Sequence, residues 1–191
     1  MSAAAESFRI ESVLSLPATL RVGGGENAPA LAAPRASLAR MSVTIRPVAK
    51  DDYAQWLPLW NGYNAFYGRS GPTALDPAIT RTTWARFFDA DEPVHALVAE
   101  EGGRLIGLAH YLYHRSTTAV GPSCYMQDLF TATEARGSGV GRMLIEAVYA
   151  AARANGAPRV YWQTHETNAA AMRLYDQVAE KSGFLVYRKM V

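Results

Sequence analysis

Residues 124–154 constrain the fold of this chain more than any other stretch. They begin with the apolar run "CYMQDLFT", pass through the glycine turn "ARGSGVGRML" at 135–144, and continue into a segment with helical spacing. Its apolar residues fall at i, i+3, i+4, i+7, i+8 and i+11, the one-face pattern of a helix packed on a core: Val140, Met143, Leu144, Ala147, Val148 and Ala151. "NGAP" then ends the segment as an Asn-Gly C-cap followed by proline. A strand, a glycine turn and a helix in succession predict part of an α/β sheet.

Strand-like and helix-like segments alternate along the rest of the chain. Alternating or apolar runs predict strands at 43–48, 94–101, 104–115, 124–131, 159–165 and 184–191. Helical spacing and capping residues predict helices at 51–67, 77–89, 140–154 and 168–183. The "GG" at 102–103 joins two of the strands as a hairpin. We therefore expect a single α/β domain with a mixed central sheet and helices on both faces.

The first forty-one residues have a different composition from the rest. They are rich in Ala, Gly and Pro and show no sustained periodicity, so they cannot bury enough apolar surface to offset their ordering entropy. We expect residues 1–41 to be a disordered extension and 42–191 to be the folded domain. Met41 stands where a translation start would suit the domain. A transit peptide is the alternative for the extension, although its acidic residues argue against one.

Composition excludes several classes of protein. The chain has 191 residues, is 49% hydrophobic and 19% charged, and carries a net charge of +2, which fits one globular domain without a nucleic-acid or membrane partner. Its apolar runs are shorter than the roughly 20 residues of a membrane span. The single cysteine, Cys124, rules out an internal disulfide and favours a reducing compartment, so we expect a cytoplasmic protein. No His, Cys or Asp spacing predicts a metal site.

The glycine turn has the chemistry of an anion site. The first turn of a helix leaves N–H groups free and carries partial positive charge. Gly137, Gly139 and Gly141 remove the Cβ atoms that would block a ligand, and Arg136 and Arg142 add cationic donors. Two common phosphate motifs do not match. A P-loop requires Gly-Lys-Ser/Thr, and the dinucleotide motif G-x-G-x-x-G differs in spacing from "GSGVGR".

The pattern that is present, R-x-x-G-x-G from Arg136 to Gly141, resembles the acyl-CoA pyrophosphate loop of the GNAT N-acetyltransferases. A second segment, "NAAAMRLY" at 168–175, is similar to that family's N-x-x-A-x-x-L/F-Y motif, and "GF" follows at 183–184. The resemblance covers residues 43–191. Through "QDLFTATEARGSGVG" and "VYWQTHETNAAAMRLY" it is nearest to the subgroup of fungal histone/polyamine and spermidine-type acetyltransferases.

The resemblance implies a sheet splayed between two central strands, 124–131 and 159–165, with acetyl-CoA held in the opening. It implies that an amine attacks the thioester directly, with acetyl-CoA as co-substrate and no metal. Backbone N–H groups of Leu129 to Thr131 then lie near the thioester carbonyl, where one donor is worth roughly 3 kcal/mol. The positions that the resemblance assigns to acetyl-CoA are Leu129, Phe130, Thr131, Arg136, Gly137, Ser138, Gly139, Val140, Gly141, Arg142 and Asn168.

Two residues are the expected catalytic pair. Tyr175 matches the family tyrosine that protonates the departing thiolate, although a core aromatic is the alternative reading of this position. The acceptor amine needs a base, because neutralising a lysine-like amine at pH 7 costs about 4.6 kcal/mol. Asp128 is the first candidate base, and it can equally bind the substrate ammonium. Polyamine-type relatives carry an acid one residue earlier, where this chain has Gln127.

Other candidate bases are His110, His165 and Glu166. The aromatic residues of the first helix resemble the acceptor wall of the family, and aromatic rings suit a cationic amine; packing against the sheet is the alternative. The residues that we expect to contact the acceptor are Trp60, Tyr63, Tyr67 and Gln127.

We therefore expect an N-acetyltransferase that acts on a primary amine of a small molecule. A protein acetyltransferase acting on lysine or N-terminal amines is one alternative, and an acyl-CoA-binding module without catalysis is another. The nearest subgroup implies a homodimer that pairs through C-terminal strands.

Overall fold

The computed structural model describes residues 42–191, and the expected extension at 1–41 lies outside the described residues. The described chain contains one five-stranded sheet in the order β1-β2-β3-β4-β5. Its strands are β1 Thr44–Pro47, β2 Val94–Glu101, β3 Arg104–His114, β4 Ser123–Thr131 and β5 Val160–Tyr161. The β1–β2, β2–β3 and β3–β4 pairs are antiparallel and the β4–β5 pair is parallel, so the predicted mixed sheet is confirmed.

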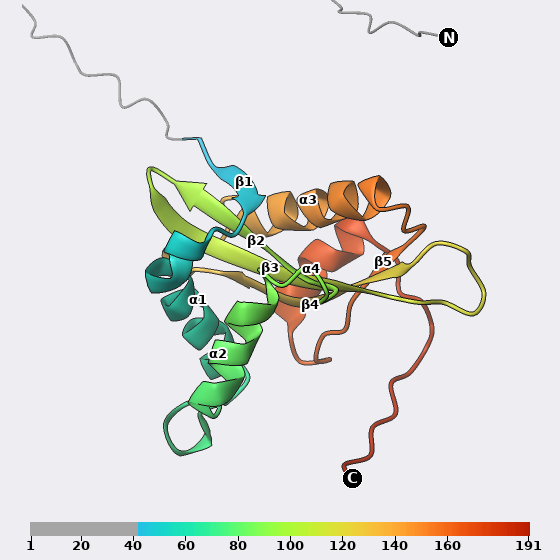
Figure 1. Cartoon of the computed structure of the whole chain (residues 1–191), viewed down its shortest axis with the longest axis horizontal. Coiled ribbons are helices and arrows are strands. Elements are labelled where there is room, and N and C mark those ends of the chain that lie inside the picture. The colour runs from blue at the N-terminus through green and yellow to red at the C-terminus, as the bar shows by residue number, and fades with distance from the viewer. Residues whose placement is uncertain (1–41) are drawn as a thin grey trace, which may run out of the picture. The chain divides into compact units, whose positions relative to one another are not determined.

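Four α-helices and three short 3-10 turns connect the strands in the described part. The helices are α1 Tyr53–Phe66, α2 Pro77–Arg86, α3 Val140–Ala154 and α4 Ala169–Val178. The turns are η1 Lys50–Asp52, η2 Gly71–Thr73 and η3 Thr133–Ala135. Helices α1 and α2 lie on one face of the sheet, and α3 and α4 lie on the other (Figure 1).

Each face of the sheet has its own apolar core. Under α1, the buried residues Trp56, Leu59 and Trp60 pack on Val98 and Leu108. Under α3, the predicted helical face contributes Val140, Leu144, Ile145, Val148 and Ala152. The one-face pattern of residues 140–151 thus identified the right helix, because its apolar stripe packs on the core of the domain.

The parallel pair of strands separates almost at once, as the resemblance implied. β4 and β5 are paired only at Cys124–Val160 and Tyr125–Tyr161. β4 continues to Thr131 while the chain after Tyr161 leaves the ladder. From residue 126 onward, one edge of β4 therefore has no strand beside it and faces an opening.

A β-bulge at Gln127 changes which face of the sheet the β4 side chains meet. His110 pairs with Asp128, whereas Tyr111 pairs with Met126, so Gln127 has no partner on β3. Before the bulge, Met126 is buried in the core under α3. After it, Asp128 shares a face with His110, because residues directly opposite in an antiparallel pair point to the same side. The bulge therefore turns Asp128 towards the α1 face.

The structure differs from the sequence prediction at the C-terminal end. The strand predicted at 159–165 is only Val160–Tyr161, because its neighbour β4 diverges from it. The helix predicted at 168–183 ends at Val178, and Ala179 is already extended. Residues 184–191 form no strand, which makes that prediction wrong, since a strand requires a ladder partner and the segment has none among residues 42–191.

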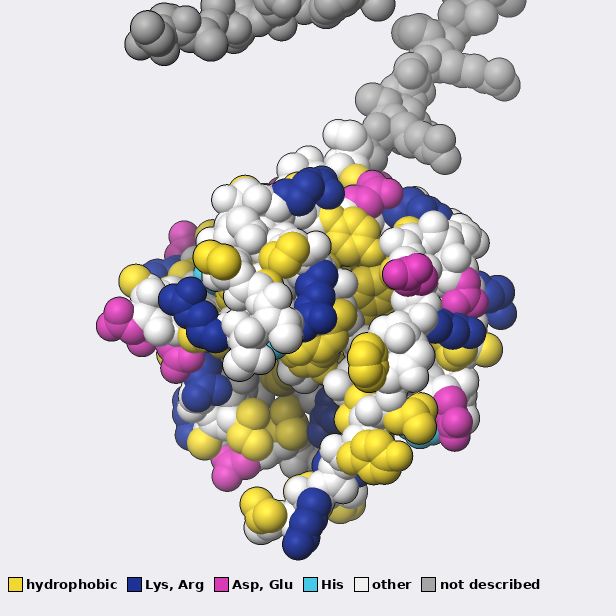
Figure 2. All heavy atoms as spheres, turned by 90° about the vertical axis from the view of Figure 1, so that its right-hand side faces the viewer, with side chains coloured by type: hydrophobic (Ala, Val, Ile, Leu, Met, Phe, Trp, Pro, Cys, Tyr) yellow, Lys and Arg dark blue, Asp and Glu magenta, His cyan; other side chains and the backbone are white. Residues whose placement is uncertain are grey.

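The C-terminal segment instead projects from the domain with its apolar side chains in solvent. Phe184 is 91% exposed and Leu185 is 79% exposed. Figure 2 shows hydrophobic side chains along the segment that extends from the lower side of the molecule.

Candidate active site

A cleft of about 710 Å³ occupies the opening beside β4. One wall is β4, with Leu129, Phe130 and Thr131, and the opposite wall includes Trp162 and Tyr175. The loop at residues 136–142, here called the anion loop, lines one end of the cleft. The strand, the loop and the second motif, which are far apart in the sequence, thus surround one space.

The backbone of the anion loop requires glycine at two positions. Gly137 has φ +77° and Gly139 has φ +91°, and a Cβ on either would meet no atom within 4 Å. The requirement is therefore conformational, because side chains rarely adopt this left-handed region. Gly139 is the N-cap of α3 and provides no side-chain cap. The N–H groups of Val140, Gly141 and Arg142 have no partner within the helix, so they remain available to an anion.

Gly141 has a role in helix packing in addition to leaving space for a ligand. A Cβ at this position would lie 3.3 Å from Leu174 Cδ2 and 3.8 Å from Thr131 Oγ1. The absence of a side chain therefore lets α3 approach α4 and β4 closely. The motif position is correct, but here glycine serves packing as well as access to the cleft, which it also lines.

The two arginines of the anion loop lie at the cleft in different settings. Arg136 donates to the Thr131 carbonyl oxygen at 3.4 Å and lies over the Phe130 ring. Arg142 donates to Gln177 on α4. Ser138 does not line the cleft, because its hydroxyl donates to the Ala135 carbonyl oxygen at 2.7 Å. Both guanidinium groups are placed to add positive charge, and the Ser138 hydroxyl is engaged within the loop.

Tyr175 packs on the core and also faces the cleft. Its ring packs against the core under α3 and meets Trp162 edge-on at 5.3 Å between centroids. It also lines the cleft. Burial, with a smaller contribution from Tyr67, raises the pKa of Tyr175 to about 12. The phenol is therefore protonated at neutral pH and able to donate a proton into the cleft.

Asn168 begins α4 as predicted. Its Oδ1 accepts from the Ala171 N–H at 3.4 Å, and its Nδ2 donates to Thr164 Oγ1 at 3.1 Å. It also lines the cleft. The cap thus fixes the start of the helix that carries Tyr175.

A second cavity of about 430 Å³ lies on the α1 side of β4, and we call it the acceptor cavity. Tyr63 and Gln127 line both the cleft and this cavity. Tyr63 and Gln127 therefore lie at the boundary between the two spaces. Trp60, His110 and Asp128 line the acceptor cavity. Tyr67, also expected at the acceptor, lines the cleft.

A buried hydrogen-bond chain ends at the Asp128 carboxylate. Trp56 Nε1 donates to His110 Nε2 at 3.0 Å, and His110 Nδ1 lies 2.9 Å from Asp128 Oδ2. Because an indole N–H can only donate, His110 Nε2 must be the acceptor and Nδ1 must carry the proton. His110 is thus a neutral donor to Asp128. Both of its ring nitrogens are therefore engaged within this chain.

No sequence pattern distinguishes Trp56 from the other aromatic residues of its helix. It stands at helical spacing among other aromatics and is completely buried, as a core residue would be. Only its pairing with His110, fifty-four positions away, distinguishes it. The other expected bases lie outside both cavities: His165 bonds to Thr167 at the surface, and Glu166 is exposed.

Tyr63 lies close to Asp128 and to a cationic residue, Arg69. Burial and the neighbouring Asp128 carboxylate raise the pKa of Tyr63 well above its usual value. The Arg69 guanidinium lies 5.7 Å from the centre of its ring. Tyr63 is thus a neutral hydroxyl at the boundary between the two cavities.

Within residues 42–191, no group of three or more His, Cys, Asp or Glu side chains is arranged to bind a metal. No helix in that range is long and apolar enough to cross a bilayer.

Known proteins resemble the chain over most of the described domain. The model of the acetyltransferase (GNAT) family matches residues 56–179. The D-amino-acid N-acetyltransferase HPA3 of Saccharomyces cerevisiae is 37% identical over 149 residues, covering 77% of this chain and 90% of that protein. The uncharacterized N-acetyltransferase YhfO of Bacillus subtilis is 31% identical over 147 residues, covering 76% and 95%.

Solved structures show the same fold. AAC(6')-Iy, an aminoglycoside N-acetyltransferase solved with a CoA-containing bisubstrate analogue, superposes with a TM-score of 0.65 at 20% identity, covering 78% of this chain and 99% of that one. With the family match spanning the anion loop, the splayed strands and α4, the chain belongs to the GNAT family of acetyltransferases.

Proposed function

We propose that this protein transfers an acetyl group from acetyl-CoA to the primary amine of a small molecule. The observation that carries the proposal is that two cavities lie next to each other and share Tyr63 and Gln127 in their linings. One cavity ends in an anion loop, and the other contains a buried carboxylate, Asp128. A donor and an acceptor bound in these spaces would meet at β4.

The cleft fits acetyl-CoA at its charged end and along its walls. The free N–H groups at the start of α3, with Arg136 and Arg142, suit a pyrophosphate. The unpaired edge of β4 offers backbone N–H groups along the cleft. These observations support assigning Leu129 to Thr131 to the acetyl end and the anion loop to the pyrophosphate.

The residues of the acceptor cavity would prepare the amine. Acetyl-CoA supplies a thioester at which the C–N bond forms while the C–S bond breaks, giving an N-acetyl amide and CoA. Asp128 takes the first proton from the substrate ammonium, leaving a nucleophilic lone pair. His110 and Trp56 hold the Asp128 carboxylate and leave one of its oxygens for the amine. Tyr175 gives its phenol proton to the sulfur and regains one from solvent. Solvent receives the second amine proton and then the proton held by Asp128, which restores the carboxylate for the next turnover.

The acceptor cavity favours a small molecule over a peptide. α1, α2, β3 and β4 all contribute to its lining, including Trp60, Phe87 and His110. Relatives named for D-amino acids and phosphinothricin, and structural neighbours named for aminoglycosides, are acetyltransferases of small amines. A structural neighbour is named as a ribosomal-protein-alanine N-acetyltransferase, so acetylation of a protein substrate is the alternative that the experiment also tests.

The similarity to yeast HPA3 supports a place near the fungal subgroup that the sequence resembles. We further propose a homodimer formed through the exposed C-terminal segment, and a cytoplasmic location, which the single free cysteine Cys124 supports.

The function is tested by incubating the full chain with acetyl-CoA and a panel of amines, and following released thiol and product mass. The panel contains amino acids, diamines, an aminoglycoside and lysine peptides. We expect turnover with at least one small amine. Turnover with peptides alone would favour a protein acetyltransferase, and acetyl-CoA binding without transfer to any amine would favour a binding module.

A further inference from the structure

We propose that the acceptor is an amino acid, and that Arg69 is the residue that binds its carboxylate. The inference rests on the proposed function, since it names the substrate class of the same cavity. It assigns the two charges of the substrate to two residues, the ammonium to Asp128 and the carboxylate to Arg69. Both residues line the acceptor cavity.

Arg69 is held in place by contacts that leave the end of its side chain free. Its Nε donates to Asn64 Oδ1 at 2.7 Å. Asn64 is buried, 4% exposed, and its Nδ2 donates to the Trp60 carbonyl oxygen at 2.9 Å. The guanidinium also lies over two rings, 5.7 Å from that of Tyr63 and 5.4 Å from that of Tyr67. A buried amide and two aromatic rings thus orient the guanidinium.

The charge of Arg69 has no acidic partner in the described part of the chain. Other arginines have acidic partners. Arg46 forms ion pairs with Asp52 and Glu100. Arg86 pairs with Glu92, and Arg104 pairs with Glu134. Arg69 forms no such pair with residues 42–191, and its two Nη groups make no hydrogen bond there. Arg86 also lines the acceptor cavity, but Glu92 neutralises it. Arg69 is therefore the oriented cation of this cavity that still needs an anion.

Both charges lie close to Tyr63. The ring of Tyr63 contacts the Arg69 guanidinium, and its hydroxyl lies close enough to Asp128 for the carboxylate to affect its titration. A cavity with a fixed cation and a fixed carboxylate beside one side chain matches a small zwitterion. An arginine fork binds a carboxylate through two parallel hydrogen bonds.

The same arrangement disfavours a polyamine. A diamine with one ammonium at Asp128 would carry its second charge in a cavity where Arg69 is already positive, and like charges repel. The remaining lining is largely apolar, with Trp60, Leu75, Ile79 and Phe87. We therefore expect an amino acid with an apolar or aromatic side chain.

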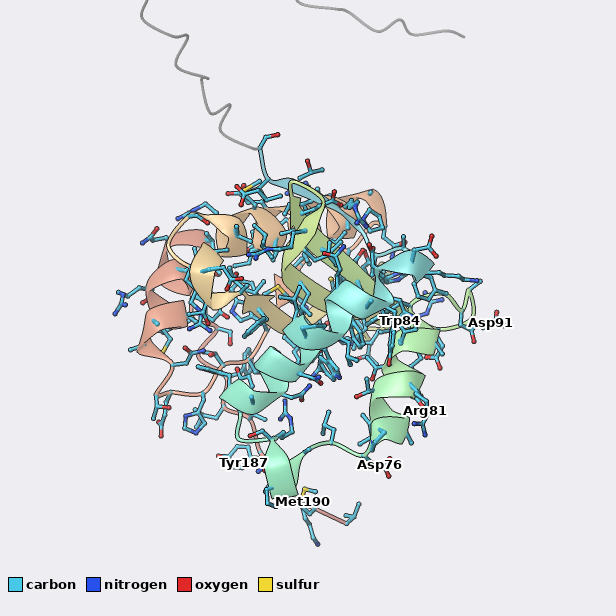
Figure 3. The ribbon with its side chains drawn as sticks, turned by 90° about the vertical axis from the view of Figure 1, so that its left-hand side faces the viewer. Asp76, Arg81, Trp84, Asp91, Tyr187 and Met190 are labelled. Carbon is cyan, nitrogen blue, oxygen red and sulfur yellow. The ribbon has the colours of Figure 1, made fainter. Side chains whose placement is uncertain are left out.

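The test compares three acceptors that differ at the carboxylate: phenylalanine as each enantiomer, phenylalaninamide and 2-phenylethylamine, with spermidine added. Steady-state kinetics are measured at saturating acetyl-CoA for the natural chain, Arg69→Gln, Arg69→Lys and a control, Arg81→Gln. Arg81 is exposed and lies on the side of α2 away from α1 (Figure 3). Each variant is compared with the natural chain for each acceptor, so that differences in amine basicity cancel.

We expect Arg69→Gln to raise KM for one enantiomer of phenylalanine ~10-fold or more, with less than about a twofold change for 2-phenylethylamine. Arg69→Lys should recover part of the loss, and Arg81→Gln should change nothing. Titration of tryptophan fluorescence with phenylalanine, without acetyl-CoA, should show the same weakening, because Trp60 lines the cavity.

Three outcomes would overturn the inference. Equal changes in KM for the acid and for 2-phenylethylamine would make Arg69 a structural residue. Turnover of spermidine or 2-phenylethylamine with no turnover of either phenylalanine enantiomer would reject the substrate class while the proposed function stands. Failure of every amine with the natural chain would reject the proposed function and the inference together.

Discussion

At the scale of single residues, Tyr175 is the tyrosine of α4 that lines the cleft while it packs on the core under α3. We predict that Tyr175→Phe lowers kcat by about 10²–10⁴-fold, because it removes the proton donor for the sulfur while keeping the ring. The dissociation constant for acetyl-CoA should change little, which calorimetry would check.

The matched control is Tyr149→Phe, which removes a hydroxyl bonded to the Val178 carbonyl oxygen away from the cleft. It should alter stability more than kcat. If Tyr175→Phe turns over at the natural rate, Tyr175 is a core residue without a catalytic role.

Asp128 is the other residue whose surroundings identify a role. We predict that Asp128→Asn lowers kcat/KM about 10²–10³-fold near neutral pH, because asparagine cannot take the amine proton. The difference in kcat/KM between the two proteins should become smaller as pH rises towards the pKa of the free amine. More of the acceptor is then already neutral, so the base is needed less. The pH–rate profiles of both proteins would show this.

Asparagine at 128 still accepts from His110, so the buried chain from Trp56 is kept in this variant. Asp176→Asn, at an exposed carboxyl on α4, should leave the profile unchanged. A constant deficit at every pH would show that Asp128 binds or positions the acceptor without removing its proton.

At the scale of elements, the start of α3 is where the glycine loop becomes a binding site. We predict that Gly139→Glu abolishes detectable acetyl-CoA binding, because it places a carboxylate at the free N–H groups and strains a backbone at φ +91°. Thermal-shift titration with acetyl-CoA measures the effect.

The control Gly103→Glu separates the effect of backbone strain from the effect of a negative charge at the anion loop. Gly103 has φ +78° and equally open surroundings, but it lies in the turn between β2 and β3. It should lower stability while leaving acetyl-CoA affinity unchanged. Unchanged affinity in Gly139→Glu would refute the assignment of the pyrophosphate to this loop.

The junction of β1 and α1 is held by a partly buried ion pair. Arg46 donates to both oxygens of Asp52, at 2.6 and 2.9 Å, and the Ala49 N–H also donates to Asp52 at 2.7 Å. The Arg46 hydrogen bonds lower the pKa of Asp52. Because the pKa of Asp52 is lower in the folded state, its ionised carboxylate stabilises the fold at pH values above the unfolded pKa, about 3.9. This contribution is lost as pH falls through the folded pKa.

We therefore predict that Asp52→Asn lowers the free energy of unfolding by about 1–3 kcal/mol at pH 7. The difference between the two proteins should shrink in acid, because both then lack the charge. Urea unfolding at several pH values would measure it, with the exposed neighbour Asp51→Asn as the control. A deficit that stays constant into acid would mean that packing, and not the ionised pair, is lost.

At the scale of the whole molecule, the exposed apolar C-terminal segment is a feature that a monomer does not explain. It begins with a run of four apolar residues, 184–187, typical of a strand, yet it has no ladder partner among residues 42–191. We predict that the full chain sediments as a dimer and that removing residues 180–191 gives a monomer, because a second copy can bury these side chains.

Light scattering behind size exclusion measures the mass of each species. Substituting glutamate for Phe184 and Tyr187 tests the same contact without shortening the chain. A full chain that remains monomeric at high concentration would refute the dimer.

The sequence by itself determined the order of the elements, the anion loop and the start of α4. These features depend on residues close in the chain: the helical spacing of 140–151, a positive φ at Gly139, and a cap from Asn168 to Ala171. Such local preferences act over a few positions, so a pattern in the sequence is enough to predict them.

Tertiary structure alone decided which side chains meet in the acceptor cavity. The bulge at Gln127 turns Asp128 towards α1, and the bond between Trp56 and His110 joins residues on a helix and a strand that pack only in the fold. Arg69 reaches the same cavity from beyond the end of α1. The C-terminal residues carry a strand pattern but have no neighbour within the domain. A strand needs a neighbouring strand for its hydrogen bonds, and a charged side chain needs a partner of opposite charge. These partners come from distant parts of the chain, and the linear sequence does not identify them.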